Sequence, residues 1–275
     1  DGTKAQVRAA RSRFSLLTMP VADFPVIQTA EWDVTLQLAQ QDLKQLLQET
    51  HFCMAQQDVR YYLNGVLLET TGKLLRAVAT DGHRMAISNL TLETDLGPTR
   101  QVIVPRKGVH ELIRMLEDND QPVEVQFSNN HLRVRAPNLS FTSKLIDGRY
   151  PEYSKVLPGK QATQLKLPRE ALRDTLARVA ILSNEKYRGI RLGLGDKTLR
   201  ISTNNPEQEE AQEEMAIEFT GEAFEVGFNV NYLIECLGSL RSEEAIVGLN
   251  DPNSSCLIHA AGSQSPQYVV MPMRL

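Results

Sequence analysis

The stretch Leu36-Gln-Leu38-Ala-Gln-Gln-Asp-Leu43-Lys-Gln-Leu-Leu47 decides the fold. Its first two leucines lie two residues apart, which suits the inward face of a strand because side chains alternate across a strand. Leu43 and Leu47 lie four residues apart, which suits one face of a helix. The hydrophobic period therefore changes near Ala39, and the pattern predicts a strand that leads into a helix.

The same apolar spacing returns in Leu165-Lys-Leu167-Pro-Arg-Glu-Ala-Leu172-Arg-Asp-Thr-Leu176. Pro168 takes the place of Ala39, and proline suits the first turn of a helix, where its missing N–H is not needed. Similarity at a fixed spacing is typical of a duplicated structural unit. We infer two copies of one strand-to-helix unit.

The duplication extends downstream of both stretches. Residues 104–116 and 228–240 each indicate the end of a strand followed by an amphipathic helix. Each copy also predicts a hairpin, because alternating segments flank turn residues. These segments are residues 66–69 and 74–78 in the first copy, and residues 190–194 and 198–202 in the second.

The start of the chain resembles the end of the first copy. Val7-Arg-Ala9 and Phe14-Ser15 correspond to Val134-Arg-Ala136 and Phe141-Thr142. We therefore expect a three-unit protein that lacks most of its first unit. Coincidence between short β patterns is the alternative for this match. The expected domains are a remnant of the first at residues 1–29, a second at 30–150 and a third at 151–275.

Length and composition indicate a soluble globular protein without a membrane partner. The chain has 275 residues, of which 41% are hydrophobic and 23% charged. No apolar run approaches the roughly 18 residues that span a bilayer, and residues 1–13 are too polar for a signal peptide. Three scattered cysteines, Cys53, Cys236 and Cys256, fit a reducing cytoplasm.

The net charge of −4 argues weakly against binding nucleic acid by bulk charge. However, the acidic residues concentrate in a predicted loop at residues 207–214. Basic residues gather near the predicted helices, and a solvated helix face is the alternative for any one of them. They are Lys44, Arg106, Lys107, Arg114, Arg169, Arg173 and Arg178.

Asp81-Gly82-His83-Arg84 could supply a base, an acid and a phosphate clamp. No nucleophile lies at a suitable spacing, so we favour a structural turn in which Gly82 adopts a positive φ. Phosphate-binding glycine loops, HExxH and EF-hand patterns are absent from the sequence. We therefore predict no catalytic residue, no metal site and no cofactor.

Two further segments stand out. Residues 147–158 connect the copies and contain Gly148, Pro151 and Pro158, which predict a stiff, exposed connector. Residues 268–275 are unusually apolar for a chain terminus. We expect a last strand at residues 268–271, followed by adaptable methionine side chains that suit peptide binding.

With these residues in view, the chain resembles the bacterial DNA polymerase III beta subunit, or sliding clamp, family from about residue 11 to residue 275. The resemblance rests on seven segments that are specific in combination. They are Arg60-Tyr-Tyr-Leu-Asn-Gly65, Ala79-Thr-Asp-Gly-His-Arg84, Val104-Pro-Arg-Lys-Gly108, Phe141-Thr-Ser-Lys144, Leu182-Ser-Asn-Glu-Lys186, Asn204-Asn-Pro-Glu-Gln-Glu-Glu210 and Tyr268-Val-Val-Met-Pro-Met-Arg-Leu275.

The resemblance implies an α+β DNA clamp fold, in which tandem repeated domains carry two helices on the inner face and antiparallel sheets outside. It also implies a non-catalytic processivity factor that encircles duplex DNA and tethers the replicative polymerase. Lysine and arginine side chains on the lining helices would contact phosphates loosely, without reading sequence. The implied partners are duplex DNA, the polymerase III alpha subunit, the clamp loader and other clamp-binding peptides.

In the family, partner peptides dock in a groove between the second and third domains. The matching positions here are Leu63, Thr80, Gly82, His83, Arg84, Met85, Pro151, Lys155, Val156, Tyr187, Asn229, Tyr232, Ser255, Val269, Val270, Met271, Pro272, Met273, Arg274 and Leu275. Lys155 and Tyr187 stand where arginine and phenylalanine are more familiar, and Asn253 stands where an apolar residue is commoner.

The resemblance also implies DNA-contact and subunit-contact residues. The DNA-contact positions are Gln57, Tyr61, Tyr62, Arg106 and Lys107, for which a plain hairpin surface is the alternative. The family forms a homodimeric ring, and the matching interface positions are Phe14, Leu16, Ile181, Leu182, Glu209 and Glu213. Because most of the first domain is missing, we expect this chain not to close that ring.

Two other functions compete with the clamp. One is an enzyme that uses Asp81, His83 and Arg84. The other is a peptide-binding scaffold fragment that cannot close a ring.

Overall fold

The computed structural model of the chain describes residues 3–24 and 31–274. These residues fall into two compact units, Asp1–Trp32 and Asp33–Leu275. In the first unit, β1 (Lys4–Ala9) and β2 (Ser12–Leu17) form an antiparallel pair, followed by the short 3₁₀ helix η1 (Val21–Asp23). The segments matched in the sequence, Val7–Ala9 with Val134–Ala136 and Phe14–Ser15 with Phe141–Thr142, therefore all lie in strands, although no side chain of the N-terminal pair is buried.

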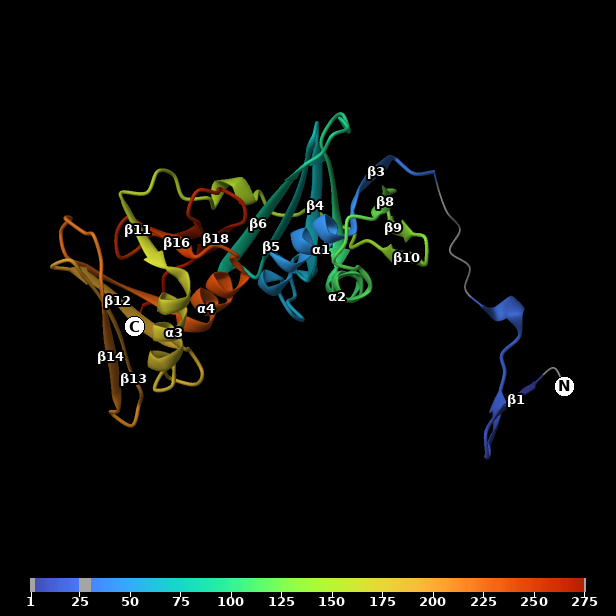
Figure 1. The fold of residues 1–275 in the computed structure, drawn as a ribbon, viewed down its shortest axis with the longest axis horizontal. Helices are drawn as coiled ribbons and strands as arrows, with labels where there is room; N and C mark the ends of the chain where they lie inside the picture. Colours follow the sequence, from blue (N-terminus) through green and yellow to red (C-terminus); the bar gives the residue numbers. More distant parts are fainter. Residues whose placement is uncertain (1–2, 25–30, 275) are drawn as a thin grey trace. The chain divides into compact units, whose positions relative to one another are not determined.

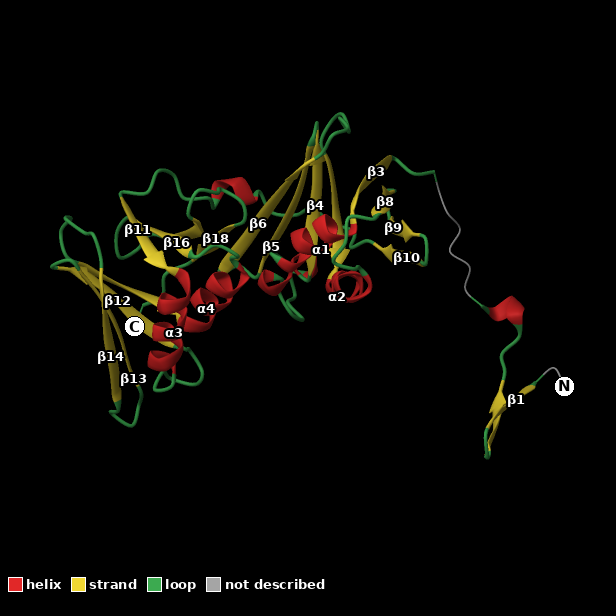
Figure 2. Cartoon of the chain, viewed as in Figure 1, coloured by secondary structure: helices red, strands yellow, loops and turns green. Residues whose placement is uncertain are grey.

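The second unit contains two copies of one order of elements, a strand, a helix, four strands, a helix and three strands (Figures 1 and 2). The first copy comprises β3 (Val34–Ala39), α1 (Gln40–Gln48), β4 (Gly65–Thr71), β5 (Leu74–Thr80), β6 (Arg84–Thr91), β7 (Arg100–Pro105), α2 (Arg106–Met115), β8 (Pro122–Phe127), β9 (His131–Ala136) and β10 (Leu139–Lys144). The second comprises β11 (Thr163–Pro168), α3 (Arg169–Ala180), β12 (Gly189–Gly195), β13 (Thr198–Asn204), β14 (Glu210–Ala216), β15 (Phe224–Asn229), α4 (Val230–Ser239), β16 (Glu244–Leu249), β17 (Cys256–Ala260) and β18 (Gln267–Val270). Short 3₁₀ helices η2 (His51–Cys53), η3 (Tyr61–Leu63) and η4 (Tyr153–Lys155) lie in the connections.

The sheets repeat in the same way as the elements. In the first copy the strands are ordered β10-β9-β8-β3 and β6-β5-β4-β7, and in the second β18-β17-β16-β11 and β14-β13-β12-β15. The predicted duplication and its two hairpins are confirmed. The fold is α+β, and its sheets are antiparallel throughout the described residues, as expected.

The leucine spacing acts as predicted. In β3, Val34, Leu36 and Leu38 are buried while the residues between them are exposed, and α1 then buries Leu43 and Leu47. The prediction for Pro168 was wrong by one residue, because α3 begins at the next residue. Pro168 still pairs with β16, so the strand continues through it.

All four α-helices of the described residues begin with the same kind of backbone hydrogen bond. The first helical N–H donates to the carbonyl of a residue that directly precedes a strand of the same copy. At three of the four helix starts no side chain caps the helix, and this bond satisfies the N–H instead. The donor–acceptor pairs are Gln40 to Gln121, Arg106 to Asn64, Arg169 to Glu243 and Val230 to Arg188, at 2.8–3.0 Å. The two halves of each copy therefore satisfy each other's helix ends.

A single sheet joins the two copies. Strand β18 of the second copy pairs with β6 of the first, from Gln267 opposite Ile87 to Val270 opposite Arg84. This pairing makes an eight-stranded sheet in the order β11-β16-β17-β18-β6-β5-β4-β7. Its strands β11, β16, β18, β6, β5 and β4 are labelled in Figure 1.

One apolar core runs through both copies, and a smaller second cluster lies beside the connector. Cys53, Cys236 and Cys256 are free and fully buried, and burial raises the pKa of each thiol. No helix in the described residues is long and apolar enough to cross a membrane.

Two sequence predictions need correction. The acidic run at residues 207–214 is only partly a loop, because its second half belongs to β14, where exposed glutamates alternate with half-buried side chains. The connector is not simply exposed, because Tyr150 and Tyr153 are 5% and 7% exposed and pack in the smaller apolar cluster. The proline and glycine content of the connector predicted exposure and gave no sign of these two buried tyrosines.

Candidate functional site

The turn between β5 and β6 forms the centre of the site. The Asp81 carboxylate accepts the backbone N–H groups of His83 at 2.8 Å and Arg84 at 3.0 Å. The Thr80 hydroxyl accepts the N–H of Gly82 at 3.1 Å and donates to the Arg84 carbonyl at 2.6 Å. Gly82 has a φ of +91°, as predicted. Asp81 thus serves the turn itself, which removes it as a free catalytic base.

A second loop, which carries Asp58 and Arg60, supports this turn through a hydrogen bond. Arg60 donates to both carboxylate oxygens of Asp58, at 3.0 and 2.8 Å, and to the carbonyl of Asp81 at 3.2 Å. The side-chain hydrogen bond from Arg60 lowers the pKa of Asp58 to about 2. Arg60 was not predicted as a supporting residue, because no local spacing links residue 60 to residue 81.

Arg84 crosses from the first copy to the second. Its side chain donates to Asp81 at 3.2 Å and to the Phe52 carbonyl at 2.7 Å, and it also forms an ion pair with Glu235 of α4. Its guanidinium lies 4.4 Å from the ring centroid of Tyr232, also on α4. Burial, and then the Asp81 carboxylate, raises the pKa of the Tyr232 phenol.

The tail after β18 bridges the two copies by backbone bonds. The Met271 N–H donates to the carbonyl of His83 in the first copy, at 2.9 Å. The Met273 N–H donates to the carbonyl of Gly227 in β15 of the second copy, also at 2.9 Å. The expected last strand is confirmed with a shift of one residue, since β18 spans Gln267–Val270.

An apolar layer lies next to the turn and the tail. Leu63, Met85 and Val269 are each at most 3% exposed and belong to the same cluster as Tyr150 and Tyr153 of the connector. Three peptide-candidate positions from distant parts of the sequence are therefore packed together.

Other candidate positions are open to solvent. Val156, Tyr187 and Met271 are 46%, 55% and 42% exposed, which is unusual for large apolar side chains. Lys155 is exposed and forms an ion pair with Glu152. These side chains are available to a ligand without rearrangement of the core.

The remaining peptide candidates are distributed as follows. Asn229 caps α4 by accepting two backbone N–H groups, and its amide donates to the Tyr187 carbonyl at 3.3 Å. Val270 is fully buried in the main core. Pro151 is exposed, Ser255, Pro272 and Met273 are half-buried, Arg274 is exposed, and Leu275 lies outside the described residues. Asn253, the departure from the family pattern, is exposed.

The DNA candidates lie on one loop and one helix start that hydrogen bonds connect. Arg106 donates through its side chain to the Met54 carbonyl at 3.2 Å and through its backbone to Asn64 at 2.9 Å. These bonds hold the loop of residues 54–64 against the start of α2.

Within that region Tyr61 is 57% exposed, and its ring lies 5.7 Å from that of Tyr62. Gln57 is exposed with a φ of +55°. Lys107 is exposed on the first turn of α2 and makes no ion pair among the described residues. Lys107 is therefore free to meet a phosphate.

The interface candidates lie on both compact units. Phe14 and Leu16 of β2 are 54% and 52% exposed. In the second unit, Ile181, Leu182 and Glu209 line one hollow of about 480 Å³, and Ile181 is 76% exposed. Glu213 accepts two hydrogen bonds from Arg178 at 2.6 and 2.7 Å, and this partner lowers the pKa of Glu213.

The described residues contain no group of three or more potential metal ligands. The site instead combines a hydrogen-bonded turn, exposed apolar side chains and a backbone tail, which can bind a peptide but supplies no proton-transfer chain to a nucleophile. The fold and site thus define a class: a duplicated α+β protein whose candidate peptide surface lies at the junction of its copies.

Comparison with known proteins assigns the chain to a family within that class. Residues 37–152 match the central domain of the DNA polymerase III beta subunit, and residues 154–274 match its C-terminal domain. The chain belongs to the DNA polymerase III beta subunit family. As a member of this family it is a non-catalytic polymerase subunit, and the relatives favour the processivity-factor prediction over the scaffold fragment.

The relatives are similar across the whole chain. The beta sliding clamps of Vibrio cholerae and Escherichia coli K12 are 48% and 49% identical over 275 residues, which is 100% of this chain and 75% of each relative. The solved Pseudomonas aeruginosa sliding clamp with ligand superposes with a TM-score of 0.96 at 48% identity, over 100% of this chain and 75% of that one. A structure of that clamp bound to griselimycin gives a TM-score of 0.95, over 100% of this chain and 74% of that one.

Proposed function

We propose that this chain acts as a sliding clamp, which encircles duplex DNA and holds a polymerase through the peptide surface at the junction of its copies. The observation that carries the proposal is the family relationship, together with two copies joined by one continuous sheet. The expected division into residues 1–29, which belong to a first clamp domain, and further domains at 30–150 and 151–275 is part of this proposal. So is a cytoplasmic location, which three free cysteines support.

Primer extension on a long circular template tests the clamp directly. With a clamp loader and polymerase of a related bacterium, adding the chain should lengthen the products made in a single binding event. Product length that does not change at saturating protein would contradict the proposal. Turnover of any substrate by the chain alone would favour the enzyme alternative.

The DNA contact should be weak and dependent on salt. Lys107→Glu should reduce duplex binding and lower the slope of log K against log salt by about one unit, because one phosphate contact is lost. Fluorescence anisotropy over a salt series measures this. Lys73→Glu is the matched control, because Lys73 is exposed on the β4–β5 turn. Equal losses for both variants would indicate bulk charge instead.

The peptide surface should bind a short partner peptide with a glutamine and leucine or phenylalanine anchors. We expect micromolar affinity, about −8 kcal/mol. Removal of residues 273–275 should weaken binding at least tenfold, because it removes the Met273 bond to Gly227 and one wall of the surface. Calorimetry measures this, and Met115→Ala, on exposed apolar surface of α2, is the control. Unchanged affinity after the deletion would exclude the tail.

Self-association is a separate part of the proposal. We propose that any contact between two chains uses Phe14 and Leu16 of one chain and Ile181 and Leu182 of the other. These side chains are apolar and accessible. The β1–β2 pair has no buried side chain, and two strands alone are marginal in water. We therefore expect a weak contact, whose two-chain species becomes more abundant as protein concentration increases. Light scattering over a dilution series measures this, and a mass that does not change with concentration would contradict it.

A further inference from the structure

A hollow of about 270 Å³ lies beside the tail, on one end of the β12–β15 sheet face. We call it the arginine pocket. Its wall side chains are Asn184, Tyr187, Arg191, Asn204, Met273 and Arg274.

The sheet register explains why this space is open. Arg191 on β12 lies opposite Gly227 on β15, which has no side chain to fill the face. Met273 bonds to the backbone of that same glycine and places the tail along the free edge of β15. The loop that carries Asn184 and Tyr187 supplies the facing wall.

The polar groups of the arginine pocket are mainly hydrogen-bond donors. The Asn184 side-chain oxygen already accepts the N–H groups of Lys186 and Tyr187, at 3.0 and 3.1 Å. The Asn204 side-chain oxygen accepts from Arg191 at 2.8 Å. Neither side-chain NH₂ group has a hydrogen-bond partner among the described residues, so both remain available as donors.

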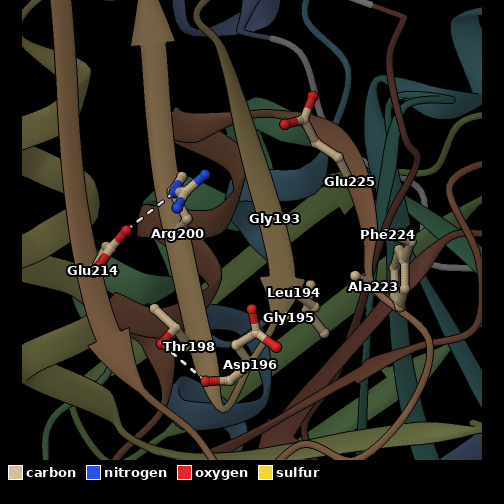
Figure 3. A pocket seen from close by; sticks show the side chains of 10 residues that line it. All are labelled: Gly193, Leu194, Gly195, Asp196, Thr198, Arg200, Glu214, Ala223, Phe224 and Glu225. Carbon is tan, nitrogen blue, oxygen red and sulfur yellow. Dashed lines mark hydrogen bonds and ion pairs between the residues drawn. The ribbon is translucent and has the colours of Figure 1, made fainter.

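The side chains that line the arginine pocket carry positive charge. Arg191 and Arg274 line it and no acidic residue does, although the Arg191 Nε also forms an ion pair with Glu225 at 3.4 Å. A second hollow on the same sheet face has the opposite character (Figure 3): Asp196, Glu214 and Glu225 line it with Arg200 alone as a cation. Residues 191, 193 and 195 share one face of the sheet, so this face carries a basic hollow near the tail and an acidic hollow beyond it, and the Arg191–Glu225 ion pair links the two.

We propose that the arginine pocket binds the side-chain carboxylate of an aspartate or glutamate that lies beside the apolar anchors of a docked peptide. Two guanidinium groups and two amide NH₂ groups offer donors that suit a carboxylate. The proposal rests on the peptide surface proposed above, because Tyr187, Met273 and Arg274 belong to both. Asn204 and Arg274 are exposed to solvent, so the peptide chain can continue past the pocket.

Calorimetry with two peptide series tests this. Both series carry the glutamine and the leucine or phenylalanine anchors with blocked ends, and one has glutamate where the other has glutamine, at successive positions flanking the anchors. The best glutamate peptide should bind roughly tenfold tighter than its glutamine twin, as expected for a hydrogen bond to a charged group. In Arg191→Gln this preference should vanish, while the glutamine peptide binds as before.

Two further variants complete the test. Asn204→Asp should reverse the preference, because it places a carboxylate in the pocket. Arg200→Gln, in the acidic hollow, should preserve it. Equal affinity of both series for the unchanged chain, or an equal loss of preference in Arg200→Gln, would overturn the proposal. Failure of every peptide to bind would refute the peptide surface itself.

Discussion

Strands β6 and β14 occupy the same place in the two copies, yet β6 is paired along both of its edges and β14 along only one among the described residues. Strand β6 is paired on both sides, by β5 and by β18 of the other copy. Strand β14 pairs only with β13 among the described residues. The side chains differ accordingly: residues 85–88 of β6 are buried, whereas β14 alternates exposed and half-buried positions.

The difference shows how one topology can produce a permanent junction and a free edge. Burial on both faces of β6 makes pairing with β18 favourable, since the alternative exposes apolar side chains. On β14, Glu210 and Glu214 face solvent, and Glu213 points toward α3, where it meets Arg178. Charged side chains of this kind are a common protection of sheet edges against unwanted pairing.

Removing a buried side chain at the junction should have the largest effect. Tyr268 of β18 is fully buried, its ring lies 5.6 Å from that of Phe52, and its hydroxyl donates to Ser239 at 2.9 Å. Tyr268→Ala should lower the free energy of unfolding by about 3–5 kcal/mol. Urea denaturation measures this, and Gln212→Ala on β14 should change it by less than about 0.5 kcal/mol. Similar losses in both would show that the junction is no more important than the edge.

A smaller loss is expected at the ion pair between the copies. Arg84→Gln should cost about 2 kcal/mol, because its side chain is 10% exposed and three acceptors lose a charged donor. Its coupling to Glu235, whose side chain is 49% exposed, should be only about 1 kcal/mol in a double-mutant cycle with Glu235→Gln. A coupling near zero would assign the cost to Asp81 and the Phe52 carbonyl.

The smallest effect on folding, but a visible one on assembly, is expected at the free edge. Replacing Glu210 and Glu214 by valine should leave the free energy of unfolding within about 0.5 kcal/mol and make the apparent mass increase with concentration. Light scattering over a dilution series measures the mass. Glu218→Val with Glu222→Val, in the following loop, is the control for charge alone. Strictly monomeric behaviour of the edge variant would show that other features protect β14.

Local patterns predicted much of each copy. The leucine spacings located β3 with α1 and β11 with α3, and the turn residues located both hairpins. Gly82 was predicted from a strand followed by a glycine-containing turn. These features depend on neighbours within a few residues, so a single sequence contains their signal.

Features that depend on distant partners were not predictable in this way. Strand β14 was predicted to be a loop because glutamate is uncommon in strands. Its pairing with β13 makes it a strand. Nothing near Arg84 indicates Glu235, and nothing near Arg191 indicates Asn204. The candidate peptide positions came from resemblance to a family, and the structure adds the backbone bonds through which the tail supports them.

The pairing of β6 with β18 also bears on how the chain is made. Synthesis proceeds from the N-terminus at about 5–20 residues per second, and domains generally fold in that order. Strand β6 ends at Thr91, but its partner begins only at Gln267. While residues 92–267 are being made, the first copy therefore presents an apolar, unpaired edge, and nascent chains on neighbouring ribosomes are most exposed to wrong association until β18 emerges.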